Sequence, residues 1–145
     1  MIITLKEANY CDIDSMIEIE QKVFEFNWTK SDFIKIFNSN KCRFIIAESQ
    51  ERLCGYLIYE FSHMGIEILN LAVNPRFLRK RIGSKLINNI MMNNIKKTDV
   101  FTYVRETNLA AQLFMKRNGF KCINIVPNYY EDTDELAYFF LHKGV

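Results

Sequence analysis

Strand-like and helix-like hydrophobic patterns follow one another at the start of the chain. Met1–Asn9 alternates apolar and polar side chains, which predicts a strand. Over Cys11–Val23 the apolar residues recur three and four positions apart, which predicts an amphipathic helix. Thr29 or Ser31 can cap a second helix, whose buried side is expected within Phe33–Phe37.

The middle of the chain has the pattern of three strands. Arg43–Glu48 and Leu53–Phe61 flank a polar turn and predict a hairpin. Ile66–Val73 is an almost unbroken apolar run, as in a strand covered on both faces. Pro75 ends this strand because proline cannot donate a ladder hydrogen bond.

The second half of the chain changes repeatedly between helical and strand-like periodicity. The expected elements are a helix over Ile82–Ile95, a strand over Asp99–Val104, a helix over Asn108–Arg117, and strands over Phe120–Val126 and Glu135–His142. The order β-α-α-β-β-β-α-β-α-β-β predicts an α+β, or mixed α/β, fold around one sheet. We find no repeat, low-complexity tract or linker, so residues 1–145 are expected to form a single domain.

The composition is that of an ordinary globular domain. Of the residues, 49% are hydrophobic and 25% are charged, and the net charge of +2 does not by itself favour a nucleic-acid partner. No stretch approaches the ~20 apolar residues that span a bilayer, and the N-terminus lacks a signal-peptide pattern. The cysteines are scattered and far from both histidines, so we expect a cytoplasmic protein without a metal site.

The junction between Ile66–Val73 and the helix from Ile82 has the features of an anion-binding site. The first N–H groups of a helix lack partners and carry a partial positive charge. Gly83 permits close approach of a ligand, Ser84 adds a hydroxyl, and Arg79–Arg81 surround the turn with positive charge. A pyrophosphate group fits this description. A solvated basic turn that caps an ordinary helix fits the local pattern equally well.

At these residues the chain resembles the GCN5-related N-acetyltransferase (GNAT) superfamily. In that family a strand ending like Leu71-Ala72-Val73 is followed by proline and then by (Gln/Arg)-x-x-Gly-x-(Gly/Ala) at the helix start. Pro75 and Gly83 match in register, whereas Leu78 stands where Gln or Arg is usual and Arg81 replaces the first glycine. The helix N–H groups stay in place if residue 81 does not need the left-handed conformation that glycine favours.

Further segments extend the resemblance over nearly the whole chain. Val104–Ala111, with Asn118-Gly119-Phe120, is similar to the family's V-R-x-x-N-x-x-A…G-F segment. Asn128-Tyr129-Tyr130, followed by Asp134–Ala137, resembles the N-Y-Y…E-D-A ending of the RimI-like ribosomal-protein-alanine N-acetyltransferases. Phe26-Asn27-Trp28 resembles that group's F-P-W loop with the proline changed.

The resemblance implies the GNAT fold, with one mostly antiparallel sheet of about seven strands and about four flanking helices. The strands at Ile66–Val73 and Asp99–Val104 would splay apart and admit the pantetheine arm of acetyl-coenzyme A. The implied cofactor contacts are Leu71, Ala72, Val73, Leu78, Arg79, Lys80, Arg81, Ile82, Gly83, Ser84, Asn108 and Met115. The implied acceptor contacts are Phe26, Trp28, Asn128 and Tyr129.

The resemblance also implies direct transfer to a protein N-terminal α-amine in a ternary complex, without an acyl-enzyme. Cys42, Cys54 and Cys122 then need no catalytic role, and we expect them in the core. The aromatic segment Phe24–Trp28 fits two interpretations, a filler between the first two helices or a wall of the acceptor site.

Transfer needs a base for the incoming ammonium and an acid for the departing thiolate. RimI-like enzymes use a glutamate and a tyrosine, at positions that hold Tyr103 and Met115 here. Glu67 occupies the place of the strand glutamate of histone-type relatives; it is either a base with a pKa raised by desolvation or an exposed edge residue. Tyr103 or Tyr130 can supply the acidic hydroxyl. Alternatively, the protein binds acetyl-coenzyme A and transfers slowly or not at all.

Three function hypotheses remain open from the sequence. The first is acetylation of a protein N-terminus, and the second is acetylation of a small amine, which acidic residues such as Glu25, Glu67, Glu131 and Asp132 would favour. The third is a coenzyme A-sensing or partner-binding module without turnover. A single short basic run, Arg76–Arg81, does not favour RNA as a partner. We expect a monomer or a weak dimer.

Overall fold

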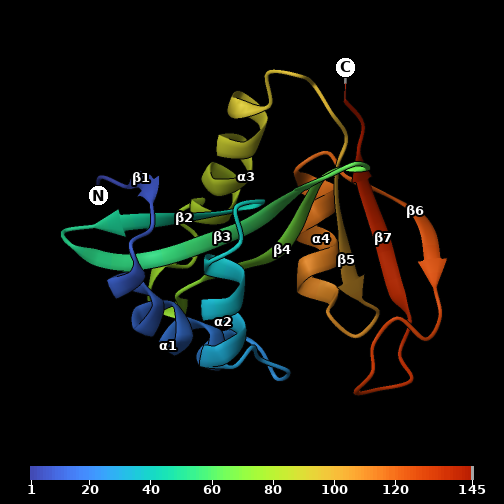
Figure 1. Cartoon of the computed structure of the whole chain (residues 1–145), viewed down its shortest axis with the longest axis horizontal. Helices are drawn as coiled ribbons and strands as arrows, with labels where there is room; N and C mark the ends of the chain where they lie inside the picture. Colours follow the sequence, from blue (N-terminus) through green and yellow to red (C-terminus); the bar gives the residue numbers. More distant parts are fainter. Residues whose placement is uncertain (145) are drawn as a thin grey trace. The chain divides into compact units, whose positions relative to one another are not determined.

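The computed structural model describes residues 1–144 (Figure 1). Its elements are β1 (Thr4–Glu7), the 3-10 turn η1 (Tyr10–Asp12), α1 (Ile13–Val23), α2 (Lys30–Phe37), β2 (Cys42–Ser49), β3 (Arg52–Ser62), β4 (Gly65–Val73), the 3-10 turn η2 (Pro75–Phe77), α3 (Ile82–Asn93), β5 (Val100–Arg105), α4 (Leu109–Arg117), β6 (Lys121–Val126) and β7 (Ala137–His142). The order of helices and strands is the one that the hydrophobic pattern predicts, so the mixed α/β fold class is confirmed.

The seven strands form one mixed sheet, hydrogen bonded in the order β1-β2-β3-β4-β5-β7-β6. The pairs β1–β2, β2–β3, β5–β7 and β6–β7 are antiparallel, and β4–β5 is parallel. Within residues 1–144 the β4–β5 pairing consists of Ile66 with Val100 and Glu67 with Phe101. So short a parallel pairing agrees with the expected splayed strands.

The chain divides into two compact units. Unit 1 comprises Met1–Phe61 and Ile68–Asn93, and unit 2 comprises Ser62–Glu67 and the residues from Asn94 onward. The strand β4 contributes to both units and passes from one to the other after Glu67. The expectation of a single domain stays a prediction.

Helices cover both faces of the strands in unit 1. α1 and α2 lie on one face and α3 lies on the other (Figure 1). Under α1 and α2, alternate strand residues such as Ile46 and Tyr56 join Met16 and Phe33 in one hydrophobic core. The intervening residues, for example Leu57, are buried as well, because the opposite face is also covered.

The strands of unit 2 are less evenly covered. Phe120 and Phe140 are fully buried, whereas residues 121–125 of the edge strand β6 are all exposed. The expectation that Cys122 lies in the core is therefore wrong, because it falls on this edge strand. Cys42 and Cys54, on the inner strands of unit 1, are buried as expected.

Two details differ from the pattern-based expectations. α3 ends at Asn93, so Ile95 lies beyond the helix and is exposed. On β4 the buried and half-buried residues alternate, which leaves Glu67, Leu69 and Val73 partly accessible on a strand expected to be covered on both faces. None of the helices in residues 1–144 is long and apolar enough to cross a membrane.

Candidate active site

The turn between β4 and α3 in unit 1 has the local structure of an anion-binding site. The side-chain Oδ1 of Asn74 accepts a hydrogen bond from the N–H of Arg76 (3.1 Å), which orders the start of the turn. α3 begins at Ile82, and the N–H of Lys85 donates to the carbonyl of Arg81 (3.0 Å). The N–H groups before Lys85 have no partner inside the helix and form its positive end.

Two arginines of this turn have left-handed backbones. Arg79 has φ of 64° and Arg81 has φ of 59°, a conformation that costs a residue other than glycine roughly 1–2 kcal/mol. Arg81 therefore adopts the left-handed conformation, so the condition stated for residue 81 is not met. α3 nevertheless begins at Ile82, and its first N–H groups lie at the turn. Leu78 and Arg79–Arg81 are exposed, Gly83 is buried and Ser84 is half-buried.

The end of β4 lies close against β3. A Cβ on Gly55 of β3 would lie 2.9 Å from the carbonyl oxygen of Ala72 and 3.2 Å from Cγ2 of Ile82. Glycine at position 55 therefore permits the observed approach of the Leu71–Val73 backbone. Ala72 is buried, while Leu71 and Val73 are half-buried.

The loop between α1 and α2 carries two predicted acceptor contacts. Phe26 is 41% exposed, whereas Trp28 is half-buried and meets the ring of Phe33 edge to face at 5.3 Å. The backbone N–H of Trp28 donates to Oε2 of Glu20 (2.8 Å). Trp28 thus fills the space beside α2, as the packing interpretation predicts, and Phe26 remains accessible to a ligand.

Glu20 is a buried polar residue that was not predicted from the sequence. This side chain is 1% exposed and accepts hydrogen bonds from the Tyr56 hydroxyl and from Nδ2 of Asn70 (2.6 Å). The signal was present in the helical pattern, because Glu20 lies four residues after the buried Met16 and next to Ile19, at a core-facing position.

Unit 2 brings together the predicted catalytic residues. Glu67 pairs with Phe101 on the neighbouring strand, and Tyr103 follows two residues later. The rings of Tyr103 and Tyr129 are stacked with centroids 4.3 Å apart. Tyr130 meets Tyr129 edge to face at 5.0 Å.

The three tyrosine hydroxyls stay protonated near neutral pH. Burial, and then the charge of Glu67, raise the pKa of Tyr103 and raise that of Tyr129 to about 12. Burial likewise raises the pKa of Tyr130 to about 12, although the positive charge of Arg105 opposes the shift. Each hydroxyl can therefore donate a proton or a hydrogen bond to an anion, and none is a base at neutral pH.

Arg105 anchors the loop that carries these tyrosines. Its guanidinium donates to both carboxylate oxygens of Asp132 (3.0 and 2.8 Å) and to Glu135 (2.9 Å), and lies 3.9 Å from the ring centre of Tyr130. Hydrogen bonds from Thr107 and then Arg105 outweigh burial and lower the pKa of Glu135 to about 2. Asp132 is thus paired with an arginine, which weakens its expected role as an acid facing the acceptor.

The other predicted contacts in unit 2 are placed as follows. Oδ1 of Asn108 accepts from the N–H of Ala111 (3.1 Å) and caps α4. Met115 is buried, with 5% of its surface exposed, and Asn128 is exposed with a left-handed φ of 57°. Their contacts with cofactor and acceptor stay predictions. Residues 1–144 contain no group of three or more His, Cys, Asp or Glu arranged to hold a metal ion.

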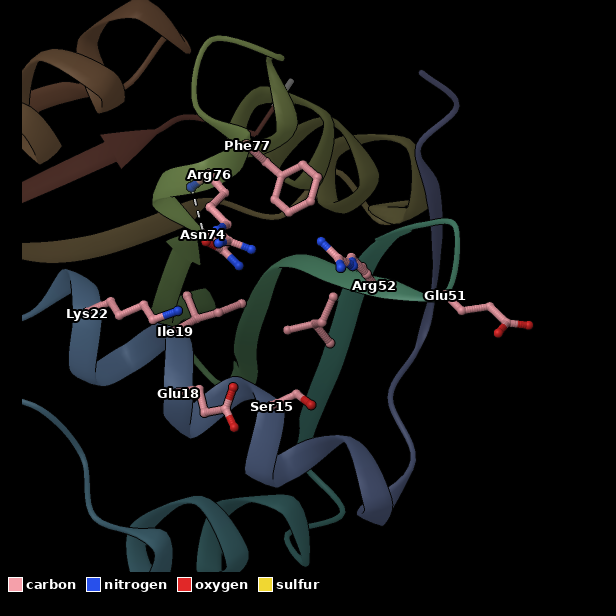
Figure 2. A pocket seen from close by; sticks show the side chains of 10 residues that line it. Ser15, Glu18, Ile19, Lys22, Glu51, Arg52, Asn74, Arg76 and Phe77 are labelled. Carbon is pink, nitrogen blue, oxygen red and sulfur yellow. Dashed lines mark hydrogen bonds between the residues drawn. The ribbon is translucent and has the colours of Figure 1, made fainter.

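A polar pocket of about 320 Å³ lies in unit 1 (Figure 2). Its lining residues come from α1, the turn before β3, the start of β3, and the segment after β4: Ser15, Glu18, Ile19, Lys22, Glu51, Arg52, Leu53, Asn74, Arg76 and Phe77. In Figure 2 the carboxylate of Glu51 points away from the other labelled side chains. None of the residues predicted to contact cofactor or acceptor lines this pocket.

Known proteins share both the sequence pattern and the fold. Residues 13–120 match the Acetyltransferase (GNAT) family. The [ribosomal protein bS18]-alanine N-acetyltransferase of Haemophilus ducreyi is 27% identical over 139 residues, which cover 92% of this chain and 91% of the relative.

Solved structures of other proteins have the same fold as this chain. The structure of Ard1 from Thermoplasma volcanium superposes with a TM-score of 0.88 at 25% identity, covering 100% of this chain and 99% of that one. Arabidopsis thaliana NAA60, solved in complex with acetyl-CoA, superposes with a TM-score of 0.83 at 18% identity, covering 98% of each chain.

The fold, the β4–α3 turn and the family match define an acetyltransferase. The chain belongs to the GNAT family, and its similarity to the ribosomal-protein-alanine enzymes supports the RimI-like branch.

Proposed function

We propose that the protein transfers the acetyl group of acetyl-coenzyme A to the N-terminal α-amine of a protein, with Glu67 as the general base. The grouping of Glu67 with Tyr103 and Tyr129 in unit 2 carries this proposal, because it joins a carboxylate to protonated hydroxyls. Proton acceptance and donation at one place are what acyl transfer between an amine and a thiol requires.

The β4–α3 turn would bind the pyrophosphate of acetyl-coenzyme A. The first-turn N–H groups of α3 supply hydrogen-bond donors, and the exposed Arg79, Lys80 and Arg81 supply positive charge. The partly accessible Leu71 and Val73 offer strand backbone for the pantetheine amides. Acetyl-CoA in the Arabidopsis NAA60 structure supports the same cosubstrate here.

The proposed reaction is a direct transfer. Glu67, acting through water, accepts a proton from the ammonium group, and the resulting amine attacks the thioester carbonyl. The N–C bond forms as the C–S bond breaks, and Tyr103 or Tyr130 donates a proton to the departing thiolate. The attacking nitrogen loses its second proton as the amide forms, and this proton restores the tyrosine hydroxyl through water. Neither step needs a cysteine nucleophile, which agrees with the buried positions of Cys42 and Cys54.

A protein N-terminus is the acceptor that the chain supports best. Phe26 in unit 1 and Tyr129 in unit 2 are each a partly exposed aromatic residue on a loop, and each by itself suits contact with a peptide. The Haemophilus ducreyi relative is named for an alanine of ribosomal protein bS18. A small cationic amine is supported less well, because Asp132 and Glu135 are already paired with Arg105.

The test measures thiol release from acetyl-coenzyme A with peptides that begin with alanine and with polyamines. Glu67→Gln should lower kcat at least about tenfold, which is roughly 1.4 kcal/mol on the barrier. The matched control is Glu60→Gln, which alters another half-buried strand glutamate without a proposed role. Full activity of Glu67→Gln would exclude Glu67 as the base. Turnover on polyamines alone would replace the peptide by a small amine, and binding of acetyl-coenzyme A without turnover would favour a binding module.

A further inference from the structure

The loop between α1 and α2 is tied at both ends to one residue. The N–H of Phe24, the first residue of the loop, donates to the backbone carbonyl of Glu20 (3.0 Å). The N–H of Trp28, one residue before the α2 cap Thr29, donates to Oε2 of the same glutamate (2.8 Å). Within the loop, the side-chain Nδ2 of Asn27 donates a hydrogen bond to the backbone carbonyl of Phe24 (3.1 Å).

The other carboxylate oxygen of Glu20 is bound to the sheet. Oε1 accepts from the hydroxyl of Tyr56 on β3 and from Nδ2 of Asn70 on β4 (2.6 Å). Burial, and then the charge of Glu20, raise the pKa of Tyr56, so its hydroxyl stays protonated and can donate. The loop is therefore connected through one carboxylate to the neighbouring strands β3 and β4.

Aromatic contacts also connect Trp28 to Tyr56. The ring of Trp28 meets Phe33 at 5.3 Å, and Phe33 meets Tyr56 at 6.0 Å, both edge to face. Tyr56 in turn binds Glu20, which binds the backbone of Trp28. The position of Trp28 is thus fixed twice, through its backbone and through its ring.

Burying a carboxylate in a core has a desolvation cost. Glu20 is 1% exposed, and apolar side chains of similar size often stabilise a fold at least as well as buried polar networks do. A leucine could fill this buried position on α1, but it could not accept a hydrogen bond from the N–H of Trp28. What the glutamate adds over a leucine is the conformation of the loop.

We propose that Glu20 is a positioning residue that holds Phe26 and Trp28 in place for the acceptor substrate. The inference rests on the proposed function, because it assigns the loop to the acceptor side. Glu20 has no direct part in the chemistry, since its side chain is fully engaged within unit 1. Its loss should therefore affect acceptor binding and leave acetyl-coenzyme A binding in unit 1 intact.

Glu20→Gln is the test, with Glu18→Gln as the matched control on the exposed side of the same helix. The amide has one accepting oxygen, so it cannot serve Trp28 and the Tyr56–Asn70 pair in the same way as the carboxylate does. Tyr56→Phe is a milder second variant that keeps the ring contact with Phe33. A thermal melt confirms that each variant is folded.

Loop order is measured without turnover. In Glu20→Gln the amide hydrogen of Trp28 should exchange at least about tenfold faster, because a hydrogen bond to a charged group is lost. The Phe24 amide, whose acceptor is the backbone of residue 20, is the internal reference. Because the chain has one tryptophan, fluorescence quenching by acrylamide reports on Trp28 directly.

Steady-state kinetics then separates positioning from general damage. We expect the KM for an alanine-starting peptide to rise at least about fivefold while the KM for acetyl-coenzyme A changes less than about twofold. Unchanged Trp28 exchange, or faster exchange with an unchanged peptide KM, would overturn the proposal. A native chain without turnover would end the proposed function, and the exchange result would still decide whether Glu20 fixes the loop.

Discussion

Tyr103 and Tyr129 form a stacked pair, with ring centroids 4.3 Å and ring planes 18° apart. Tyr103 lies on β5 and Tyr129 lies on the loop before β7, so the stack joins a strand to a loop within unit 2. The charge of Glu67 contributes to the raised pKa of both hydroxyls. A phenylalanine at position 103 would keep the stack and remove the hydroxyl.

Tyr103→Phe tests whether that hydroxyl is the proton donor. If it is, kcat should fall at least about 100-fold, which is the lower end of the range for general acid catalysis. The melting temperature should stay close to that of the native chain, because the ring contacts remain. Tyr138→Phe, on β7 and half-buried, is the control for removing a hydroxyl. An unchanged kcat for Tyr103→Phe would transfer the role to Tyr130.

The hydrogen bonds from Thr107 and Arg105 to Glu135 predict how the stability of the fold depends on pH. The pKa of Glu135 is lowered to about 2 in the folded chain, below its ordinary value of 4.5. The unfolded chain therefore binds the proton first as the pH falls. The stabilisation from Glu135 is fully present above about pH 4.5 and is lost between pH 4.5 and 2.

Thermal melts of native chain and Glu135→Gln between pH 7 and pH 2.5 measure this contribution. The melting temperature of the native chain should fall further on acidification than that of the variant. The difference between the two melting temperatures should therefore shrink as the pH falls. A constant difference over the whole range would mean that Glu135 stabilises the loop by packing and neutral hydrogen bonds, not by its charge.

Local patterns predicted the elements of this chain because each element has a strong periodicity and a clear boundary. Of the two predicted caps, Thr29 and Ser31, the structure has Thr29 at the start of α2, and its capping box with Asp32 is a signal within four residues. Cys122 was misplaced because an apolar residue on a strand gives no sign that the strand lies at the edge of the sheet. Sheet order depends on pairing between distant segments, which periodicity does not encode.

The same limit applies to the candidate site. The turn between Asn74 and Ile82 was found because its residues are contiguous, and the stack of Tyr103 on Tyr129 was not, because the two are far apart in sequence. Glu20 was missed because helical periodicity is read from apolar residues, and an acidic residue on the apolar face does not contribute to it. Its partners Tyr56 and Asn70 lie on different strands, and no local pattern connects them.

Gly55→Ala tests the close approach of β3 to the end of β4. The added Cβ would lie 2.9 Å from the Ala72 carbonyl oxygen, so the backbone must move. We expect a loss of stability of about 1–3 kcal/mol, as for overpacked cores, together with weaker binding of acetyl-coenzyme A. Denaturant unfolding and calorimetric titration measure the two effects. Native affinity in the destabilised variant would show that the backbone of Leu71–Val73 does not bind the cosubstrate.

The left-handed backbone of Arg81 predicts an unusual response to glycine. In Arg81→Gly the relief of roughly 1–2 kcal/mol of backbone strain should exceed the entropic cost of glycine, about 0.5–1 kcal/mol. The variant should therefore be more stable than the native chain. Lys80→Gly is the matched control, because Lys80 is the neighbouring cation and is not among the residues with positive φ. It should be less stable.

Both variants remove one positive charge from the same turn, so the difference between their unfolding free energies isolates the backbone conformation. Both should bind acetyl-coenzyme A more weakly than the native chain at low salt, and the deficit should shrink as salt screens the lost charge. Arg81→Gly should be affected less, since it recovers the glycine of the family pattern. If Arg81→Gly were destabilised as much as Lys80→Gly, the left-handed conformation would carry no strain in this turn.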